Sequence, residues 1–348
     1  MLSITLVSLI LWVCKIIHAD KIDDTIKTKP GDWSYGTGEK RVDDWPQTCK
    51  SGRKQSPIDI FTENTIETKH ILPFVFHGYD TIPLDLEVKN KGHSLYFYKH
   101  VEGKSPSLTG GGLPENDEFE FWSGHFHWST ANDSGAEHHI DPDLEQTSRD
   151  KAPLELHLVH WNKAMGKNAS EAIAKNRWNS LAVLGIKFDI VERDNLLLAP
   201  FFESLQHVKN ENDKVNLATK LPLKAFLPRG TGRFFRYNGS LTTPECQEVV
   251  IWTIFKDREH ISAKQLEALR QTRKVNNKTQ TNSNVRPVQP LNGRKVLDID
   301  TRDYGVRGKE KTKEQLGPQR EFKNTGSNCR LPFMFEFIIQ VLLYVNVY

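Results

Sequence analysis

Three histidines lie in two short runs with the spacing of strand residues that share a face. His125 and His127 are two apart in Gly124-His-Phe-His-Trp, and His157 lies in Glu155-Leu-His-Leu-Val-His-Trp. Alternate side chains of a strand leave the same side, so His125 and His127 project together. If the two strands pair with these faces aligned, three imidazoles converge with room for a fourth ligand. Three nitrogen ligands and one open position describe a catalytic zinc site.

Glu155 shares a strand face with His157 and is placed to accept the second N–H of that ring. A carboxylate in this position commonly fixes the tautomer and orientation of a zinc-bound histidine. An ordinary exposed glutamate is the alternative, but it fits poorly within so apolar a run. His160 has the opposite parity, so we expect a core residue or an outer partner of the site, not a ligand.

Short strands predominate around these two runs. Residues 84–98 are predicted to form two strands joined by a turn at residues 90–93. A continuous apolar run at residues 181–190 is typical of a buried central strand.

Helices are predicted at two places, at residues 200–208 by spacing and after Ser262 by a capping box with Gln265. Residues 132–151 are a long polar connection, which predicts a loop. Of its two adjacent histidines, we expect one to be buried and structural and the other to lie at the surface. The pattern favours an α+β, β-dominated fold, with one large sheet and peripheral short helices instead of βαβ units.

Composition limits the classes of function. The chain has 348 residues, of which 26% are charged, and a formal net charge of +3, so no nucleic-acid footprint stands out. Residues 1–19 are mostly apolar, too short to span a bilayer as an ordinary helix, and end at Ile17-His-Ala19, which resembles a signal-peptide cleavage site. This pattern predicts a secretory signal peptide. Residues 20–30 are polar and expected to be loose, and no feature indicates an oligomeric state.

The C-terminal region differs in composition from the rest. Residues 298–330 are charged, which predicts a flexible stalk. Residues 331–348 form a hydrophobic tail after small residues, which is typical of a GPI-anchor signal and predicts membrane attachment. Glu336 and Gln340 weaken both that interpretation and a transmembrane helix. A GPI anchor, a transmembrane tail and an unanchored chain therefore stay open.

Secretion would permit a disulfide. Cys14 leaves with the signal peptide and Cys329 lies in the tail, so Cys49 and Cys246 remain to pair. Two free buried thiols are the alternative. Four sequons are candidates for N-glycosylation, at Asn132, Asn168, Asn238 and Asn277. Asn238 adjoins an expected active-site segment, which would limit its access to a sugar.

Several motifs together resemble the signature of the α-class carbonic anhydrases. They are the two histidine runs, Asp32-Trp-Ser-Tyr-Gly, Gln55-Ser-Pro-Ile-Asp-Ile, Gly135-Ala-Glu-His, Ser240-Leu-Thr-Thr-Pro and Asn284-Val-Arg-Pro-Val-Gln-Pro-Leu. They follow the family's order across residues 31–297, which we take as a single domain. The resemblance implies a large, mostly antiparallel central sheet with zinc at the base of a conical cleft. It also supports pairing of Cys49 with Cys246, because secreted and membrane-bound members carry that disulfide.

The same resemblance assigns the catalytic residues, with the three histidines as zinc ligands. Thr242 matches the threonine that accepts a hydrogen bond from zinc-bound hydroxide, and Glu137 the glutamate that orients it. An ionised carboxylate can only accept, so it takes the Thr242 proton and leaves the threonine oxygen to accept in turn. His93 matches the proton-shuttle histidine, whose ordinary pKa near neutrality suits that task. Tyr35 matches a tyrosine of the ordered-water network.

The surroundings of the centre are assigned in the same way. The outer partners of the ligands are Glu155, Ser123 and Asn284. The wall that holds carbon dioxide is formed by Val159, Val183, Leu241, Thr243, Val250 and Trp252. Ser123 replaces a common glutamine and is shorter, so we expect His125 to be held less firmly, at some cost in metal affinity. Gly124 replaces a phenylalanine, and Lys91 and Tyr96 replace smaller polar residues, with Tyr96 expected to narrow the cleft.

These features predict a zinc enzyme outside the cell or at its surface that reversibly hydrates carbon dioxide to bicarbonate and a proton. The alternative is a catalytically weak or silent carbonic-anhydrase-like module that binds or adheres. Silent members typically lose a zinc-ligand histidine, whereas all three are present in this chain.

Overall fold

The computed structural model describes residues 33–35, 42–100, 103–141, 152–272 and 283–304. The expected signal peptide, the stretch at residues 20–30, the Asn277 sequon, most of the expected stalk and the hydrophobic tail lie outside these residues. Within the described ranges, no helix has both the length and the apolar character needed to cross a membrane.

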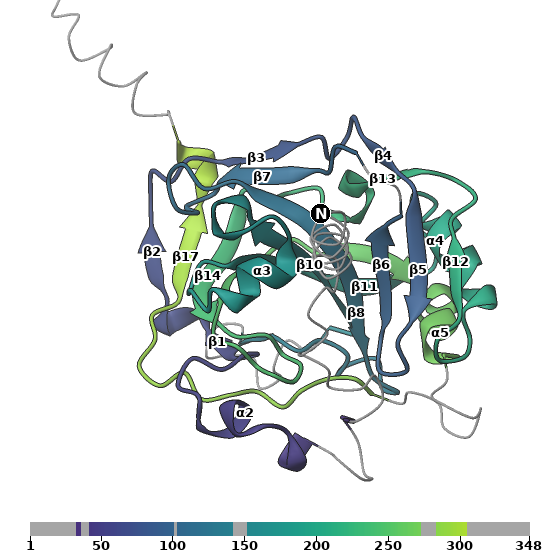
Figure 1. Ribbon diagram of the computed structural model, residues 1–348, viewed down its shortest axis with the longest axis horizontal. Coiled ribbons are helices and arrows are strands. Elements are labelled where there is room, and N and C mark those ends of the chain that lie inside the picture. The colour runs from purple at the N-terminus through teal and green to yellow at the C-terminus, as the bar shows by residue number, and fades with distance from the viewer. Residues whose placement is uncertain (1–32, 36–41, 101–102, 142–151, 273–282, 305–348) are drawn as a thin grey trace, which may run out of the picture. The chain divides into compact units, whose positions relative to one another are not determined.

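Strands form most of the regular structure, as Figure 1 shows. Those before residue 142 are β1 (Asp59–Phe61), β2 (Ile66–Thr68), β3 (Phe74–His77), β4 (Pro83–Leu84), β5 (Leu86–Asn90), β6 (Leu95–Lys99), β7 (Ser107–Gly110), β8 (Phe119–Trp128) and β9 (His139–Asp141). Those after it are β10 (Leu154–Asn162), β11 (Leu181–Val191), β12 (Lys214–Asn216), β13 (Leu221–Pro222), β14 (Arg233–Gly239), β15 (Val250–Phe255), β16 (Glu259–Ser262) and β17 (Leu297–Asp300).

One 13-stranded sheet dominates the described residues, with the path β12-β5-β6-β8-β10-β11-β15-β14-β17-β2. β16 also pairs with β11, and β7 pairs with β3 and β8. Most neighbours are antiparallel, whereas β11 runs parallel to β15 and β16, and β17 runs parallel to β2. The predicted β-dominated fold around a large, mostly antiparallel sheet is therefore confirmed.

The helices are short and lie outside the sheet: α2 (Gln47–Ser51), α3 (Ala169–Ala174), α4 (Ala199–Ser204) and α5 (Ala263–Arg270). α4 continues as a 3-10 turn at Leu205–His207. α5 opens with the predicted capping box, in which the Ser262 hydroxyl accepts from the Gln265 N–H and the Gln265 side chain accepts from the Ser262 N–H. Both helices expected from the sequence are confirmed.

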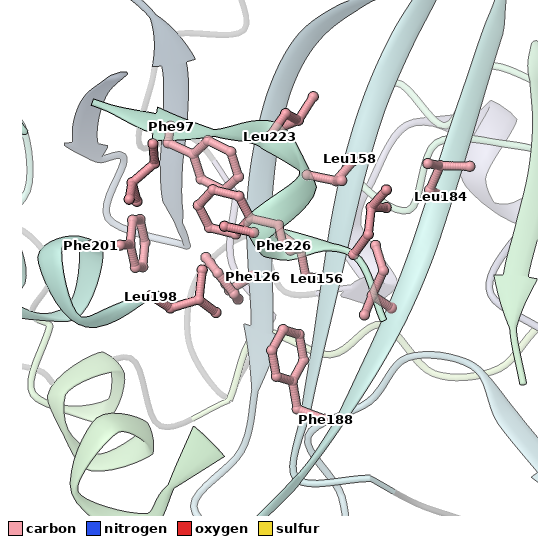
Figure 2. Packing of buried hydrophobic residues seen from close by; sticks show 14 of the residues in the cluster. Phe97, Phe126, Leu156, Leu158, Leu184, Phe188, Leu198, Phe201, Leu223 and Phe226 are labelled. Atoms are coloured by element: carbon pink, nitrogen blue, oxygen red, sulfur yellow. The ribbon is translucent and has the colours of Figure 1, made fainter. Parts of the chain in front are cut away.

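β10 lies between β8 and β11, and apolar side chains cover one face of these strands. Figure 2 shows Phe97, Phe126, Phe201 and Phe226 packed together beside the leucines of β10. The Phe97 and Phe226 rings are stacked with their centroids 4.6 Å apart. A fully buried side chain of this size contributes roughly 1.5–3 kcal/mol to stability. This apolar cluster stabilises the sheet from one side and leaves the opposite face of β8 and β10 for other side chains.

Two predictions about chain organisation need correction. Within the stretch expected to be a loop, residues 139–141 form β9, which pairs in parallel with β1. His139 is half-buried, and its Nδ1 atom lies 2.9 Å from Asp59 Oδ1. This histidine is therefore paired and is not simply the surface residue that was expected. A partner some 80 residues earlier specifies this strand, and a polar three-residue segment gives no local sign of it.

The structured region also continues past residue 297, where the stalk was expected to begin. β17 runs to Asp300 and pairs with β14, and a 3-10 turn follows at Thr301–Asp303. Ile299 is buried, and its charged neighbours hide this apolar position in the composition. Asn238 is exposed, contrary to the expectation that it would be enclosed, and Asn132 and Asn168 are exposed too.

Candidate metal centre

The register between β8 and β10 brings the two histidine runs together. His157 lies directly opposite His125, and Glu155 lies opposite His127. All four side chains leave the same face of the sheet because residues two apart on a strand share a side. One nitrogen from each histidine lies within 4.8 Å of the others, and the three rings are buried. The cluster can therefore hold a metal ion.

Two of the three rings are fixed by a hydrogen bond at the nitrogen that points away from the centre. His127 Nδ1 lies 2.7 Å from the Asn284 carbonyl oxygen, and His157 Nε2 lies 2.7 Å from Glu155 Oε1. The opposite atoms, His127 Nε2 and His157 Nδ1, are buried and have no hydrogen-bond partner among the described residues. Buried polar atoms are nearly always satisfied. These two unsatisfied nitrogens, each on a ring whose other nitrogen is hydrogen-bonded, fit a site built for a cation such as zinc.

The electrostatics of the cluster favour neutral imidazoles, which is the form that binds metal. Burial lowers the pKa of His125 and His127 well below the ordinary range, and the neighbouring rings lower it further. Burial also lowers the pKa of His157, although Glu155 acts in the opposite direction.

His125 is held differently from the other two histidines. Its Nδ1 atom is buried and has no hydrogen-bond partner among the described residues. Ser123, the expected outer partner, lies opposite Tyr98 on β6, and His125 lies opposite Tyr96. Gly124 has its own explanation, because a Cβ atom there would lie 2.0 Å from the Phe97 ring. Phe97 thus fills the space that a larger residue at position 124 would need.

Glu155 joins two histidines. Its Oε1 atom lies 2.7 Å from His157 Nε2 and 2.7 Å from His138 Nδ1, and its Oε2 atom accepts the His138 backbone N–H at 2.9 Å. Burial alone would raise the pKa of Glu155, but the two histidines hold it well below the ordinary range. His138 Nε2 lies 2.6 Å from the Tyr237 hydroxyl, so this chain of contacts reaches β14. Sequence reasoning expected one buried histidine here but gave it no partner.

Glu137 and Thr242 also meet beside the centre. Glu137 Oε1 lies 3.4 Å from His127 Nδ1 and accepts the Arg286 backbone N–H at 2.8 Å. Burial raises the pKa of Glu137 well above its usual range, whereas a hydrogen bond from Thr242 and the Arg286 N–H oppose that rise. A nearby dication would act in the same direction as these donors. The sequence motif contained Arg286, but its role in holding Glu137 depends on long-range packing and was missed.

Aromatic residues surround the expected proton-shuttle histidine. The His93 ring lies 4.1 Å from the Trp33 ring and 5.8 Å from the Tyr96 ring, measured between centroids. Gly92 adopts φ +80°, so glycine suits the turn that presents His93. Tyr35 lies edge-on to His127 at 6.5 Å, and burial raises the pKa of its hydroxyl.

Apolar residues expected to hold carbon dioxide gather in a second cluster, on the histidine face of the sheet. Its buried members include Val159, Val183, Val250 and Trp252, with Leu241 packed against them. The Trp252 ring lies 4.7 Å from the His157 ring. Thr243 is half-buried beside Thr242. The conical cleft itself stays a prediction.

Cys49 and Cys246 form the predicted disulfide, which is confirmed. It packs with Trp45, and Trp33 and Tyr35 lie against the same cluster. Because Cys246 follows Thr242 by four residues, the bond ties the N-terminal aromatic segment to the Thr242 loop. The two segments that flank the histidines are thereby joined covalently.

Comparisons with known proteins agree with this geometry. A sequence model described as eukaryotic-type carbonic anhydrase matches residues 39–299. The chain is 30% identical to mouse "Carbonic anhydrase 15" over 76% of its length and 82% of the relative. It is 34% identical to mouse "Carbonic anhydrase 4" over 73% of its length and 77% of the relative. The match to "Putative carbonic anhydrase 5" of Caenorhabditis elegans is 33%, covering 76% of the chain and 80% of the relative.

Proposed function

This chain belongs to the eukaryotic-type carbonic anhydrase family and is a carbonate dehydratase, and we propose that zinc held by His125, His127 and His157 is its catalytic metal. One observation carries the proposal. His127 and His157 each keep one buried nitrogen free for the cluster while the other nitrogen is hydrogen-bonded. A silent binding module would not need this arrangement, and no observation favours that alternative.

When bound, zinc acts as a Lewis acid that brings water deprotonation near neutral pH, a property for which carbonic anhydrases are the standard example. Thr242 and Glu137 orient the attacking oxygen. In this proposal the Thr242 hydroxyl donates to the Glu137 carboxylate, so its oxygen is left to accept a hydrogen bond from the nucleophile. This directs a lone pair of the nucleophile towards the substrate.

The other residues place the substrate and remove the proton. The apolar cluster around Val159, Val183 and Trp252 suits carbon dioxide, which has no net charge or dipole. Bicarbonate is charged and is held poorly by such a wall, which favours its release. His93 passes the proton to buffer, because imidazole is the side chain suited to take up and release protons near neutral pH.

Zinc content and carbon dioxide hydration of the purified chain test the metal assignment. The native chain should carry one zinc per molecule, whereas His157→Ala should lose the metal and at least about a hundredfold of the activity. His77→Ala is the matched control, because His77 is an exposed histidine on β3. Full activity of His157→Ala would overturn the assignment.

The shuttle role of His93 has a separate test. His93→Ala should lower turnover by as much as about 100-fold in weak buffer, and added imidazole should restore it. Zinc content should not change. A loss of turnover that imidazole does not repair would argue against proton transfer through His93.

We also propose that the protein acts outside the cell and is attached to the membrane by its C-terminal tail. The disulfide supports an oxidising compartment, and three of the four sequons lie on exposed asparagines. Treatment of intact cells with a phosphatidylinositol-specific phospholipase should release the chain. Protein that stays on the cells, or that is already in the medium, would contradict the GPI anchor.

A further inference from the structure

The three proposed ligands are not held in the same way. His127 and His157 each have a hydrogen bond that fixes one ring nitrogen, but His125 Nδ1 has no such partner among the described residues. Second-shell hydrogen bonds normally orient metal-bound imidazoles. His125 therefore needs another source of orientation if it binds the proposed zinc.

Tyr96 makes the closest ring contact with His125 on the β6 side. The two residues are opposite each other in the β6–β8 register. Their rings are stacked, with centroids 4.8 Å apart and planes inclined by 24°. Because directly opposite side chains share a face, the tyrosine ring lies alongside the metal cluster and not in the apolar core.

Tyr96 is itself held by two neighbours. The Lys91 ammonium lies 4.4 Å from the centroid of its ring, a cation–π contact. The Tyr98 ring lies 5.9 Å away with its plane inclined by only 7°. Lys91 contacts Tyr98 as well, at 5.1 Å. The ring stacked on His125 is thus one member of a packed group of three side chains.

We propose that Tyr96 is a positioning residue for the metal ligand His125, and that ring stacking replaces the side-chain hydrogen bond which Ser123 is too short to make. This inference rests on the proposed zinc site. Stacking restricts the tilt of the imidazole, but it does not select which nitrogen carries the proton. The structure therefore makes His125 the ligand with the least directional restraint.

The kinetics of zinc loss distinguish this role from a merely structural one. Zinc transfer from the holoenzyme to an excess of chelator should be about threefold to tenfold faster in Tyr96→Leu than in the native chain. Tyr96→Phe keeps the ring and should stay within about twofold of the native rate. Tyr79→Leu is the matched control and should leave the rate of zinc loss unchanged, because Tyr79 is stacked on His160, a histidine that is not a proposed ligand.

A second substitution tests whether a hydrogen bond to His125 can replace the stacked ring. Ser123→Gln in the Tyr96→Leu chain adds a side chain long enough to bond His125 Nδ1, and it should return zinc loss to within about twofold of the native rate. Thermal unfolding of the metal-free proteins shows whether the variants fold. An unchanged rate in a folded Tyr96→Leu protein would overturn the inference, as would equal acceleration in Tyr96→Phe. A native chain that binds no zinc would instead overturn the proposed function and, with it, this inference.

Discussion

The two faces of β8 and β10 are both buried around the histidines but are built from different interactions. One face carries the three histidines with Glu155, joined by hydrogen bonds to Asn284 and His138. The other face carries Phe126, Leu156 and Leu158 within the large apolar cluster shown in Figure 2. The same backbone positions both sets, because neighbouring residues on a strand point to opposite sides.

The difference lies in what each face leaves unsatisfied. Apolar side chains lose nothing by being enclosed, so that face can be packed for stability alone. On the histidine face, buried nitrogens remain without partners, which costs free energy in the absence of a ligand. We conclude that the apolar face supplies stability, and that this stability offsets the cost of leaving buried nitrogens unpartnered on the opposite face.

Phe126→Ala gives the largest expected effect and tests this division directly. Phe126 lies between two of the proposed ligand histidines in the sequence, but its ring packs against Phe201 at 5.2 Å and Phe97 at 6.1 Å. Its loss should reduce the free energy of unfolding by about 3–5 kcal/mol. The folded protein should keep nearly native zinc affinity, because the histidines leave the other face.

Denaturant unfolding and zinc titration of the same Phe126→Ala sample measure the two quantities. Phe126→Leu is the matched control and should cost considerably less, because most of the buried volume is kept. A fall in zinc affinity as large as the fall in stability would show that the two faces are not separable.

Strand period, with the assumption that the two runs pair with their polar faces aligned, predicted the convergence of the histidines and the position of Glu155. It succeeded because a period of two is local and the register followed from matching buried faces. The fold class was predictable for the same reason. The roles of Glu137 and Thr242 came from the family resemblance, since nothing near Thr242 in the chain marks it as more than a loop hydroxyl.

What the sequence did not predict depends on distant partners. Arg286 holds Glu137 from 149 residues away, and the three residues of β9 form a strand only because β1 lies beside them. The stack of Tyr96 on His125 required the register of β6 with β8. The sequence predicted that Ser123 would hold His125 less firmly than the usual glutamine. The structure adds that the Tyr96 ring is stacked on His125.

Glu155→Gln tests how much the histidine face contributes to zinc affinity. The side chain keeps its size but loses the charge that accepts from both His157 and His138. We expect zinc affinity to fall by about 10–100-fold, or roughly 1.4–2.7 kcal/mol, measured by chelator competition. Leu156→Met is the matched change next to it on the apolar face, and it should leave zinc affinity unchanged. Equal effects of both variants on zinc affinity would contradict the division between faces.

The smallest effect concerns His160, which lies three residues after His157 but on the apolar face. It contacts the Tyr79 hydroxyl and the Phe121 ring, and burial lowers its pKa to about 3. The unfolded chain binds a proton at this histidine near pH 6.5, whereas the folded chain does not. Stability from this group is therefore fully present above pH 6.5 and decreases as the pH falls towards 3.

Between pH 7.5 and 5.5 this histidine should remove about 1.4 kcal/mol from the free energy of unfolding. His160→Gln should be less sensitive to acid by that amount, measured as the difference in denaturant unfolding at the two pH values. Comparing the change in unfolding free energy between the two pH values in each protein cancels any constant cost of the substitution, including the lost contact with Tyr79. Equal changes in the two proteins would mean that the apolar face tolerates a charged histidine. His160 would then no longer differ from His157 in the way we infer, with the first buried as a neutral ring with hydrogen-bond partners and the second with one nitrogen left unpartnered for a metal.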